Sequence, residues 1–365
     1  MNQQSLKLTA YFGERQRAAG EPRTFLADAM LDLFGDRGVA TSVMLRGITS
    51  FGPKHELRTD ESLSLSEDPP VTIAAVDVEP KIRSLVDDVT AMTDRGLVTL
   101  ERARLVTREG GAEALSGIGS RNGDGTKLTV YVGRQERVNG KPAPYAVCAL
   151  LHRHGFAGAT VLLGVDGTAH GERRRARFFG RNVNVPLMII AIATAERASA
   201  AATELAAVLP NPLLTVERVR ICKRDGELFA RPQELPATDE HGRTLWQKLM
   251  VYTAEECLPD GQPIHRALVH RLLQTETSRG ATALRGIWGF HGEHKPHGDK
   301  MFQLTRKVPV TTIIVDTPDS IARTFDIVDE LTAGHGLVTS EMVPAAVSLR
   351  GGQWTGETPL AEYDY

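Results

Sequence analysis

The sequence has little cysteine, no long hydrophobic run and almost no net charge. Its three cysteines, Cys148, Cys222 and Cys257, are an odd number spaced too far apart for a C-x-x-C site, so we expect reduced thiols. No apolar run approaches the roughly 18 residues of a membrane span, and the start resembles no secretion signal, so we expect a cytoplasmic protein. The 43 basic and 45 acidic residues argue against a chain built mainly to bind nucleic acid or an anionic membrane.

Familiar catalytic motifs are also missing. The sequence contains no Walker phosphate loop, no H-E-x-x-H, no G-x-S-x-G elbow and no G-x-G-x-x-G after a strand. No nucleophile can be paired with a base from the sequence, so we predict that the protein is not an enzyme. An unrecognised enzyme remains the third and least favoured interpretation.

The sequence does contain a threefold internal repeat, which indicates the domain organisation. The segment that begins at Lys7 recurs from Lys127 and from Lys248, at offsets of 120 and 121 residues. In each copy a glycine (Gly47, Gly164 or Gly286) precedes a proline (Pro70, Pro186 or Pro309) by 22 or 23 residues. We predict domain 1 at 1–108, a Gly-rich linker at 109–125, domain 2 at 126–224, a second linker at 225–245, domain 3 at 246–350 and a tail at 351–365.

Each repeat has the pattern strand, helix, strand, strand, helix, strand. In repeat 1 the predicted strands are 6–12, 43–45, 71–78 and 98–106, and Pro22 and Pro80 lead into the helices. This is the ferredoxin-like order of an α+β fold. The third strand is apolar on both of its faces, although the two helices can cover only one. We therefore predict three sheets packed face inward, an intramolecular pseudo-trimer.

Motifs at the base of the long loops resemble a known family. Residues 46–52 read Arg-Gly-Ile-Thr-Ser-Phe-Gly and 285–290 read Arg-Gly-Ile-Trp-Gly-Phe, similar to the Arg-Gly-Ile-x-Gly-Phe-Gly of the "domain of unknown function 190" family. Residues 65–73 resemble its Leu-Ser-Glu-Asp-x-Pro-Val-x-Ile, and Gly-Leu-Val-Thr occurs at Gly96 and Gly336. The resemblance covers about 300 residues and indicates three tandem copies.

This resemblance implies a PII-like protein. PII signalling proteins are trimers that hold nucleotides in the clefts between subunits and reach partners with a long loop after the second strand. Genes of the resembling family often lie beside fluoride channel genes, an association and not a mechanism, which makes a membrane channel one candidate partner. Repeat 2 departs from the motif, with Leu163 in place of the arginine and Gly167-Thr168 in place of Gly-Phe. We therefore expect three clefts that are not equivalent.

The candidate ligand-binding residues lie at the bases of these loops or within them. An arginine beside an open glycine amide suits a phosphate or carboxylate, and a phenylalanine can stack on a base or anchor a partner. The alternative is structural, with the arginine pairing with an acid and the glycine serving backbone geometry. The candidates are Arg46, Gly47, Phe51, Gly52, Gly164, Arg173, Arg174, Arg175, Arg177, Arg285, Gly286 and Phe290.

The charge is distributed unevenly among the repeats. Residues 127–224 carry a net charge of +9, whereas 7–107 carry −3 and 246–347 carry −2. The arginine-rich loop of repeat 2 is typical of a site for an anionic ligand or an acidic partner, or it is a solvated loop that balances its acidic neighbours. Nucleic acid is disfavoured because aromatic interleaving is limited to Phe178 and Phe179.

A metal site is not expected. His291, His294 and His297 are weak candidates, because their spacing matches no zinc pattern and Lys295 would repel a cation.

The leading interpretation is a PII-like sensor or regulator. It would bind a small anionic ligand, with a nucleotide as one option, at interdomain clefts and signal through its long loops to a partner. The alternative is a ligand-free interaction protein whose arginine-rich loop docks an acidic partner, such as the cytoplasmic face of a membrane channel.

Overall fold

The computed structural model describes residues 4–53, 55–59, 68–106, 124–173, 185–258, 261–291, 297–298 and 308–363. Three units follow one another, and each has the predicted order of main elements. The first comprises β1 (Ser5–Gly13), α1 (Leu26–Asp36), β4 (Thr41–Phe51), β6 (Pro70–Val78), α2 (Glu79–Met92) and β7 (Arg95–Val106). The second comprises β8 (Asp124–Gly133), α3 (Ala143–Arg153), β11 (Gly158–Leu163), β14 (Pro186–Ala193), α4 (Ala195–Val208) and β15 (Leu214–Arg224). The third comprises β17 (Trp246–Ala254), α5 (Ile264–Thr275), β18 (Ala281–His291), β20 (Pro309–Asp316), α6 (Pro318–Leu331) and β21 (Leu337–Val343). The α+β prediction is confirmed.

Shorter strands complete the described structure. They are β2 (Arg17–Ala18), β3 (Glu21–Phe25), β5 (Leu57–Thr59), β9 (Arg137–Val138), β10 (Lys141–Pro142), β12 (Asp166–Ala169), β13 (Glu172–Arg173), β16 (Glu227–Leu228), β19 (His297–Gly298), β22 (Ala345–Arg350) and β23 (Gln353–Glu357). None of the helices in these ranges is long and apolar enough to cross a membrane.

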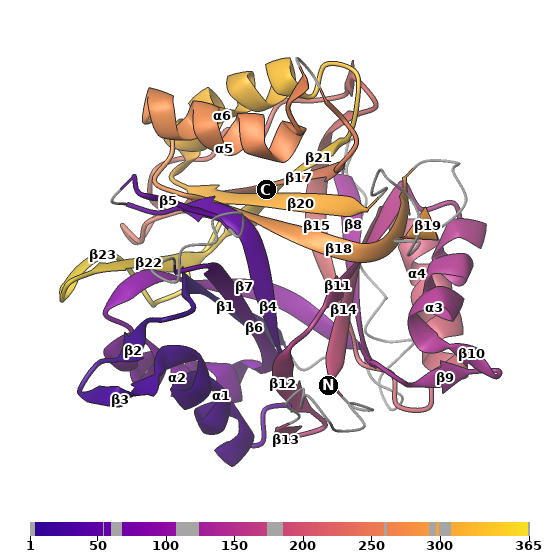
Figure 1. Ribbon diagram of the computed structural model, residues 1–365, viewed down its shortest axis with the longest axis horizontal. Coiled ribbons are helices and arrows are strands. Elements are labelled where there is room, and N and C mark those ends of the chain that lie inside the picture. The colour runs from indigo at the N-terminus through magenta and orange to yellow at the C-terminus, as the bar shows by residue number, and fades with distance from the viewer. Residues whose placement is uncertain are drawn as a thin grey trace.

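Helices α2 and α6 each begin with a proline in the first turn, followed by an apolar stripe. Pro80 occupies the first turn of α2, where its missing N–H costs no hydrogen bond. Ile82, Leu85 and Val89 follow at helical spacing and are fully buried against the sheet. The same arrangement recurs in α6, where Pro318 opens the helix and Ile321, Phe325 and Val328 are buried. One pair of helices covers the outer face of the strands of each unit, and the main strands of all three units belong to one 19-stranded sheet (Figure 1).

Within each unit the strands pair in one antiparallel order. β1 lies between β6 and β7, and β6 also pairs with β4. The second unit repeats this order as β11, β14, β8 and β15, and the third as β18, β20, β17 and β21.

Strands also pair across the seams between units. The end of β7 pairs with the start of β15, the end of β15 pairs with β21, and β22 pairs with the start of β7, all antiparallel. Near the loops, β4 pairs with β18, β18 with β11, and β12 with β4. The pairings therefore lead from the first unit to the others and back again, with the strands inside and the helices outside (Figure 1).

The third strand of each unit is buried on both faces, as its composition predicts. In β14, Ile189 belongs to the core beneath α3 and α4. Its neighbours Met188 and Ile190 point the other way, into a central core to which all three units contribute. Alternation along one strand thus separates the unit's own core from the shared one.

Two cysteines are part of this packing. Cys148 and Cys222 are fully buried and unbridged, and burial raises the pKa of each thiol to about 12. Both therefore act as small apolar side chains.

The segments at 225–245 and 351–363 make specific contacts with each other. The Asp239 carboxylate accepts hydrogen bonds from the backbone N–H groups of His241, Arg243 and Glu362. β23 folds back on β22 as a hairpin, and Leu360 and Ala361 beyond it are buried. Both segments thus lie against the three units.

Candidate functional site

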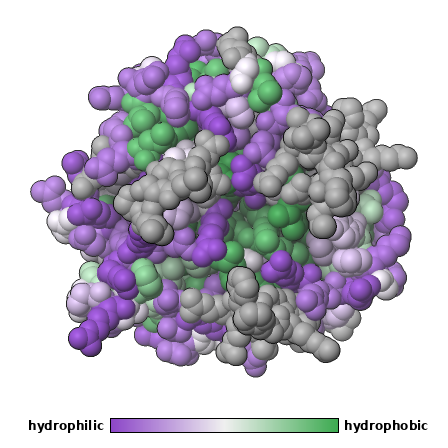
Figure 2. All heavy atoms as spheres, in the orientation of Figure 1, coloured by the Kyte–Doolittle hydropathy of each residue, from purple (hydrophilic) through white to green (hydrophobic). Residues whose placement is uncertain are grey.

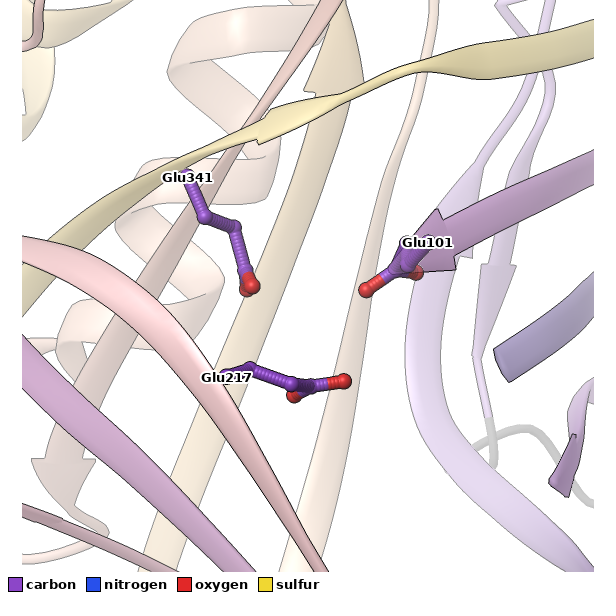
Figure 3. A group of neighbouring side chains, drawn as sticks. All are labelled: Glu101, Glu217 and Glu341. Atoms are coloured by element: carbon purple, nitrogen blue, oxygen red, sulfur yellow. The ribbon is translucent and has the colours of Figure 1, made fainter. Parts of the chain in front are cut away.

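Six buried charged side chains meet at the point where the three units join. Lys7, Lys127 and Lys248 come from the first strand of each unit, and Glu101, Glu217 and Glu341 come from the last. Figure 3 shows the three glutamates pointing toward one another from β7, β15 and β21. We call this group the charge ring.

The ion pairs of the charge ring alternate around a closed circuit. The Lys7 ammonium lies 2.8 Å from Glu101 and also binds Glu217. Lys127 lies 2.7 Å from Glu217 and 2.6 Å from Glu341. Lys248 lies 2.9 Å from Glu341 and also binds Glu101, which closes the circuit. Each lysine therefore joins the glutamate of its own unit to the glutamate of one neighbour.

The electrostatics of the ring favour the ionised form of Glu101, Glu217, Lys7 and Lys248, whereas burial lowers the pKa of Lys127 despite its contacts with Glu217 and Glu341. Burial alone would raise the pKa of Glu101, but Lys248 and Lys7 hold that pKa well below its usual value. Burial alone would lower the pKa of Lys248, but Glu101 and Glu341 raise it above the ordinary value. The three carboxylates approach within 4.8 Å of one another, close enough for metal ligands. Because each already contacts two ammonium groups, we interpret the ring as a structural junction.

Two clefts open at the seams around this junction. The first, which we call the basic cleft, lies between repeats 1 and 3 and encloses about 100 Å³. Its walls include Tyr11, Phe51, Leu97, Trp246, Ile313 and Leu349. Four arginines also line it, Arg58, Arg95, Arg279 and Arg350, against one acid, Glu56.

Among the described residues, the guanidinium groups of the basic cleft make no ion pair at good hydrogen-bond distance. Arg58, Arg95 and Arg279 approach Asp68, Asp94 and Asp316 only to 3.6, 3.5 and 3.6 Å, beyond good hydrogen-bond distance. Arg350 stands directly opposite Arg95 in the β22–β7 pair and has no ion-pair partner within the described ranges. The Arg279 guanidinium also lies 5.4 Å from the centre of the Trp246 ring. The cleft combines exposed positive charge with an aromatic wall.

The second cleft lies between repeats 2 and 3 and is larger, about 630 Å³. Apolar residues such as Phe290 and Leu337 line it together with Asp225, Glu256, Glu330, His291 and His335. Its charged groups are mainly acidic, so the two clefts differ in the charge they present. In Figure 2, apolar side chains are visible in the hollow near the centre of the displayed face, with polar residues along part of its border.

The predicted arginines make structural ion pairs. Arg46 donates from Nε to Glu14 at 2.8 Å, and Arg285 donates to Glu255 at 2.7 Å. The acids occupy equivalent positions in repeats 1 and 3. Arg173 contacts Asp28 at 3.0 Å and Asp166 at 2.8 Å, and it also pairs with Asp32, which connects β13 to α1 across a seam. These contacts raise the pKa of Arg173 despite its partial burial.

The predicted glycines lie where strands approach closely at the seams. A Cβ on Gly47 or Gly286 would lie 2.8 Å from the ring of Pro70 or Pro309, and one on Gly164 would lie 2.0 Å from the Pro186 carbonyl oxygen. The recurring glycine-to-proline spacing in the sequence therefore corresponds to a packing contact between the glycine and the proline of each repeat, where two strands approach each other.

The remaining predicted residues are divided between the clefts. Phe51 and Gly52 line the basic cleft, and Phe290 and His291 line the other. His291 pairs with Asp225. Arg174, Arg175, Arg177 and His294 lie outside the described residues, as does the side chain of His297.

Neither the charge ring nor the four arginines of the basic cleft were predicted as site residues from the sequence. A signal for the ring was present, because all three repeats carry a lysine in an apolar strand and a glutamate two residues after the threonine of the last strand. The arginines gave no such signal, since Arg58, Arg95, Arg279 and Arg350 are dispersed over almost 300 residues and meet only through the fold.

Comparison with known proteins establishes the family. The model of the DUF190 family, described as "Uncharacterized ACR", matches residues 5–105, 125–221 and 246–345. The chain belongs to this family. The DUF190 chain is also 31% identical over 103 residues to a UPF0166 protein of Aquifex aeolicus (strain VF5), an alignment covering 28% of this chain and 94% of that protein. The three matches confirm three tandem copies.

A similarity to a solved structure is much weaker. The crystal structure of aspartate kinase from Synechocystis aligns with 95% of the DUF190 chain at 10% identity and a TM-score of 0.23, and the alignment spans 45% of the kinase chain. A TM-score this low supports no conclusion about fold or function.

Proposed function

We propose that this DUF190 protein is a PII-like sensor or regulator. Its three units are proposed to be ferredoxin-like domains of an intramolecular pseudo-trimer, and the basic cleft between repeats 1 and 3 is proposed to bind a small anionic ligand. Support for the arrangement comes from the strand pairings that return from the third unit to the first and from the charge ring where the units meet. The family comparison supports a general regulatory role.

The proposed ligand class rests on the residues that line the basic cleft. Its guanidinium groups can donate to phosphate or carboxylate oxygens, and its aromatic wall suits a flat apolar group. A nucleotide combines both chemistries. The enclosed volume of about 100 Å³ would hold only part of such a ligand. The rest would lie on the open side, beside the exposed arginines.

Ligand contacts in this cleft would reach the base of the repeat 1 loop. Gly52, Glu56 and Arg58 line the cleft and belong to the connection between β4 and β5 or to β5 itself. A ligand that contacts them would favour one arrangement of this hairpin over others and so shift its population. The proposed output is a change in what the loop presents to a partner.

Isothermal titration calorimetry tests the ligand proposal. The panel comprises adenine and guanine nucleotides with one to three phosphates, together with citrate as an anion without a base. We expect saturable binding of at least one nucleotide, and we expect Arg279→Ala and Arg350→Ala each to weaken it at least about tenfold. Arg323→Ala, which removes an exposed arginine from α6, is the matched control and should leave affinity unchanged.

Two outcomes would count against the proposal. If no nucleotide binds at millimolar concentration, the proposed ligand class is wrong. If all three variants weaken binding equally, the ligand does not bind in the basic cleft. Chromatography of the nucleotide after incubation distinguishes a sensor from an enzyme, because a sensor leaves the nucleotide intact whereas an enzyme converts it to product.

A further inference from the structure

A second and smaller pocket lies at the seam between repeats 1 and 3. It has a volume of about 90 Å³, and its lining includes Thr49 and Thr59 from repeat 1 and His265, Arg266 and Arg285 from repeat 3. It shares no lining residue with the basic cleft. A whole nucleotide would not fit in this volume, whereas a single small oxyanion would.

The buried imidazole of His265 is the feature that points to a ligand. His265 is the second residue of α5 and is only 1% exposed. Neither ring nitrogen has a hydrogen-bond partner among the described residues. A buried polar group without a partner is rare in folded proteins, because leaving it unsatisfied costs free energy. An occupant of the pocket would supply the missing partner.

The charges around the pocket determine the chemistry of that occupant. Arg266, Arg285 and His270 all line it, and no acidic residue does so in the described part of the chain. Burial and the charge of Arg285 lower the pKa of His265 to about 4, so its imidazole is neutral near pH 7 and offers one N–H. Arg285 is paired with Glu255, but that carboxylate does not line the pocket. Cationic side chains with N–H and hydroxyl donors favour an anion over a cation or an apolar guest.

The repeats themselves show why the pocket exists at this seam. Thr49 lies two residues after Gly47, and Trp288 lies two residues after Gly286, so they occupy equivalent positions. At the seam between repeats 3 and 2, the Trp288 ring packs against Tyr145 of α3, with centroids 4.7 Å apart. Pro144 is the second residue of α3, where His265 stands in α5. At the seam between repeats 1 and 3, Thr49 therefore takes the place of Trp288, and His265 takes the place of Pro144.

We propose that this pocket is a binding site for one small oxyanion, of the size of formate or phosphate, held by the His265 N–H, the Thr49 hydroxyl and the adjacent arginine charge. The site is separate from the basic cleft. It would give the seam between repeats 1 and 3 a second ligand, distinct from any nucleotide.

Nuclear magnetic resonance of histidine-labelled protein tests the site directly. The His265 signal, assigned by its absence from His265→Gln, is followed while sodium phosphate and then sodium formate are titrated at constant ionic strength. We expect a saturable shift of this signal for at least one anion and no saturable shift for the exposed His335. Arg350→Ala should leave the affinity unchanged, because Arg350 lines only the basic cleft.

Two substitutions of Thr49 complete the test. Thr49→Trp should abolish binding by filling the pocket as Trp288 fills the equivalent place. If this variant does not fold, Thr49→Val keeps the volume, removes the hydroxyl and should weaken binding by at least about fivefold. A His265 signal that does not move or shifts without saturating would overturn the proposal, as would binding that Arg350→Ala abolishes or that Thr49→Val leaves unchanged.

Discussion

Each side chain of the charge ring depends on two oppositely charged neighbours, and this dependence makes the ring sensitive to a single substitution. Glu341 contacts both Lys127 and Lys248, and all three are almost completely buried. Replacing Glu341 with glutamine would leave two buried ammonium groups with too little negative charge. We expect Glu341→Gln to lower the free energy of unfolding by about 3–5 kcal/mol, measured by urea denaturation.

The matched control for this prediction is an exposed ion pair. Glu330 lies 2.9 Å from Arg271, and both side chains are about half exposed. Glu330→Gln should change stability by less than about 1 kcal/mol. Similar losses for the two variants would show that the ring contributes no more than a surface pair.

His265 gives the protein a specific dependence on pH. Its folded-state pKa of about 4 lies below the unfolded value of about 6.5. Above pH 6.5 the imidazole is neutral in both states, and its contribution to stability is fully present. Between about pH 6.5 and 4 only the unfolded chain takes up the proton, so stability falls by roughly 3 kcal/mol.

A variant isolates this contribution from that of the carboxylates. In buffers without phosphate or carboxylic acids, wild-type protein should lose more stability between pH 7 and 4.5 than His265→Leu, as measured by urea denaturation. Parallel losses in the two proteins would show that His265 is not the group that responds.

At the scale of elements, the seam glycines determine how closely two strands can approach. A Cβ on Gly164 would lie 2.0 Å from the Pro186 carbonyl oxygen and 3.1 Å from Val43 of the neighbouring unit. We expect Gly164→Ala to destabilise the fold by at least about 3 kcal/mol, because backbone as well as side chain must move. Thermal unfolding measures the effect.

A second glycine provides the comparison. Gly334 has no heavy atom within 4 Å of a built Cβ and does not have a positive φ. Gly334→Ala should therefore change stability by no more than about 0.5 kcal/mol. A large effect there, or a small one at Gly164, would contradict the packing argument.

Some elements are encoded by local sequence features, whereas others depend on contacts with distant segments. Helix α2 was predictable because Pro80 and the stripe from Ile82 to Val89 are local features. The second strand of repeat 1 was predicted at 43–45 but extends over Thr41–Phe51. Its first half pairs with β6 of its own unit, whereas its second half pairs with β18 of repeat 3. Pairing with another unit lengthens the strand, and no local pattern in the sequence encodes that partner.

The candidate sites show the same division. Phe51 and Gly52 were identified from a motif, and they do line a cleft. The motif arginines Arg46 and Arg285 were equally prominent in the sequence, yet each is held by a glutamate of its own repeat. His265 carried no motif at all. Its importance depends on burial and on the absence of a hydrogen-bond partner in the described part of the chain, which only the packed structure reveals.

At the scale of the whole molecule, the last described strands complete the connection from the third unit to the first. β22 pairs with β7, and Val347, Leu349 and Leu360 are buried against the first unit. We expect deletion of residues 345–363 to cost at least about 5 kcal/mol through lost apolar burial. It should also promote self-association in size-exclusion chromatography, because the edge of β7 becomes free to pair.

Trp354→Ala is the control within the same hairpin, because its side chain is largely exposed on β23. This variant should keep both the melting temperature and the elution volume of the wild type. A deletion variant that behaves in the same way would show that the fold does not depend on this closing contact.

Because the three repeats are joined in one polypeptide, their sequences can differ from one another. An assembly of three separate copies of one chain must present the same residue at all three seams. Here one polypeptide supplies the lysines and glutamates of the charge ring in every repeat, yet it places Thr49 at one seam and Trp288 at another. The ring can thus stay uniform while each seam carries different side chains, so the two sites proposed between repeats 1 and 3 need not recur at the other seams.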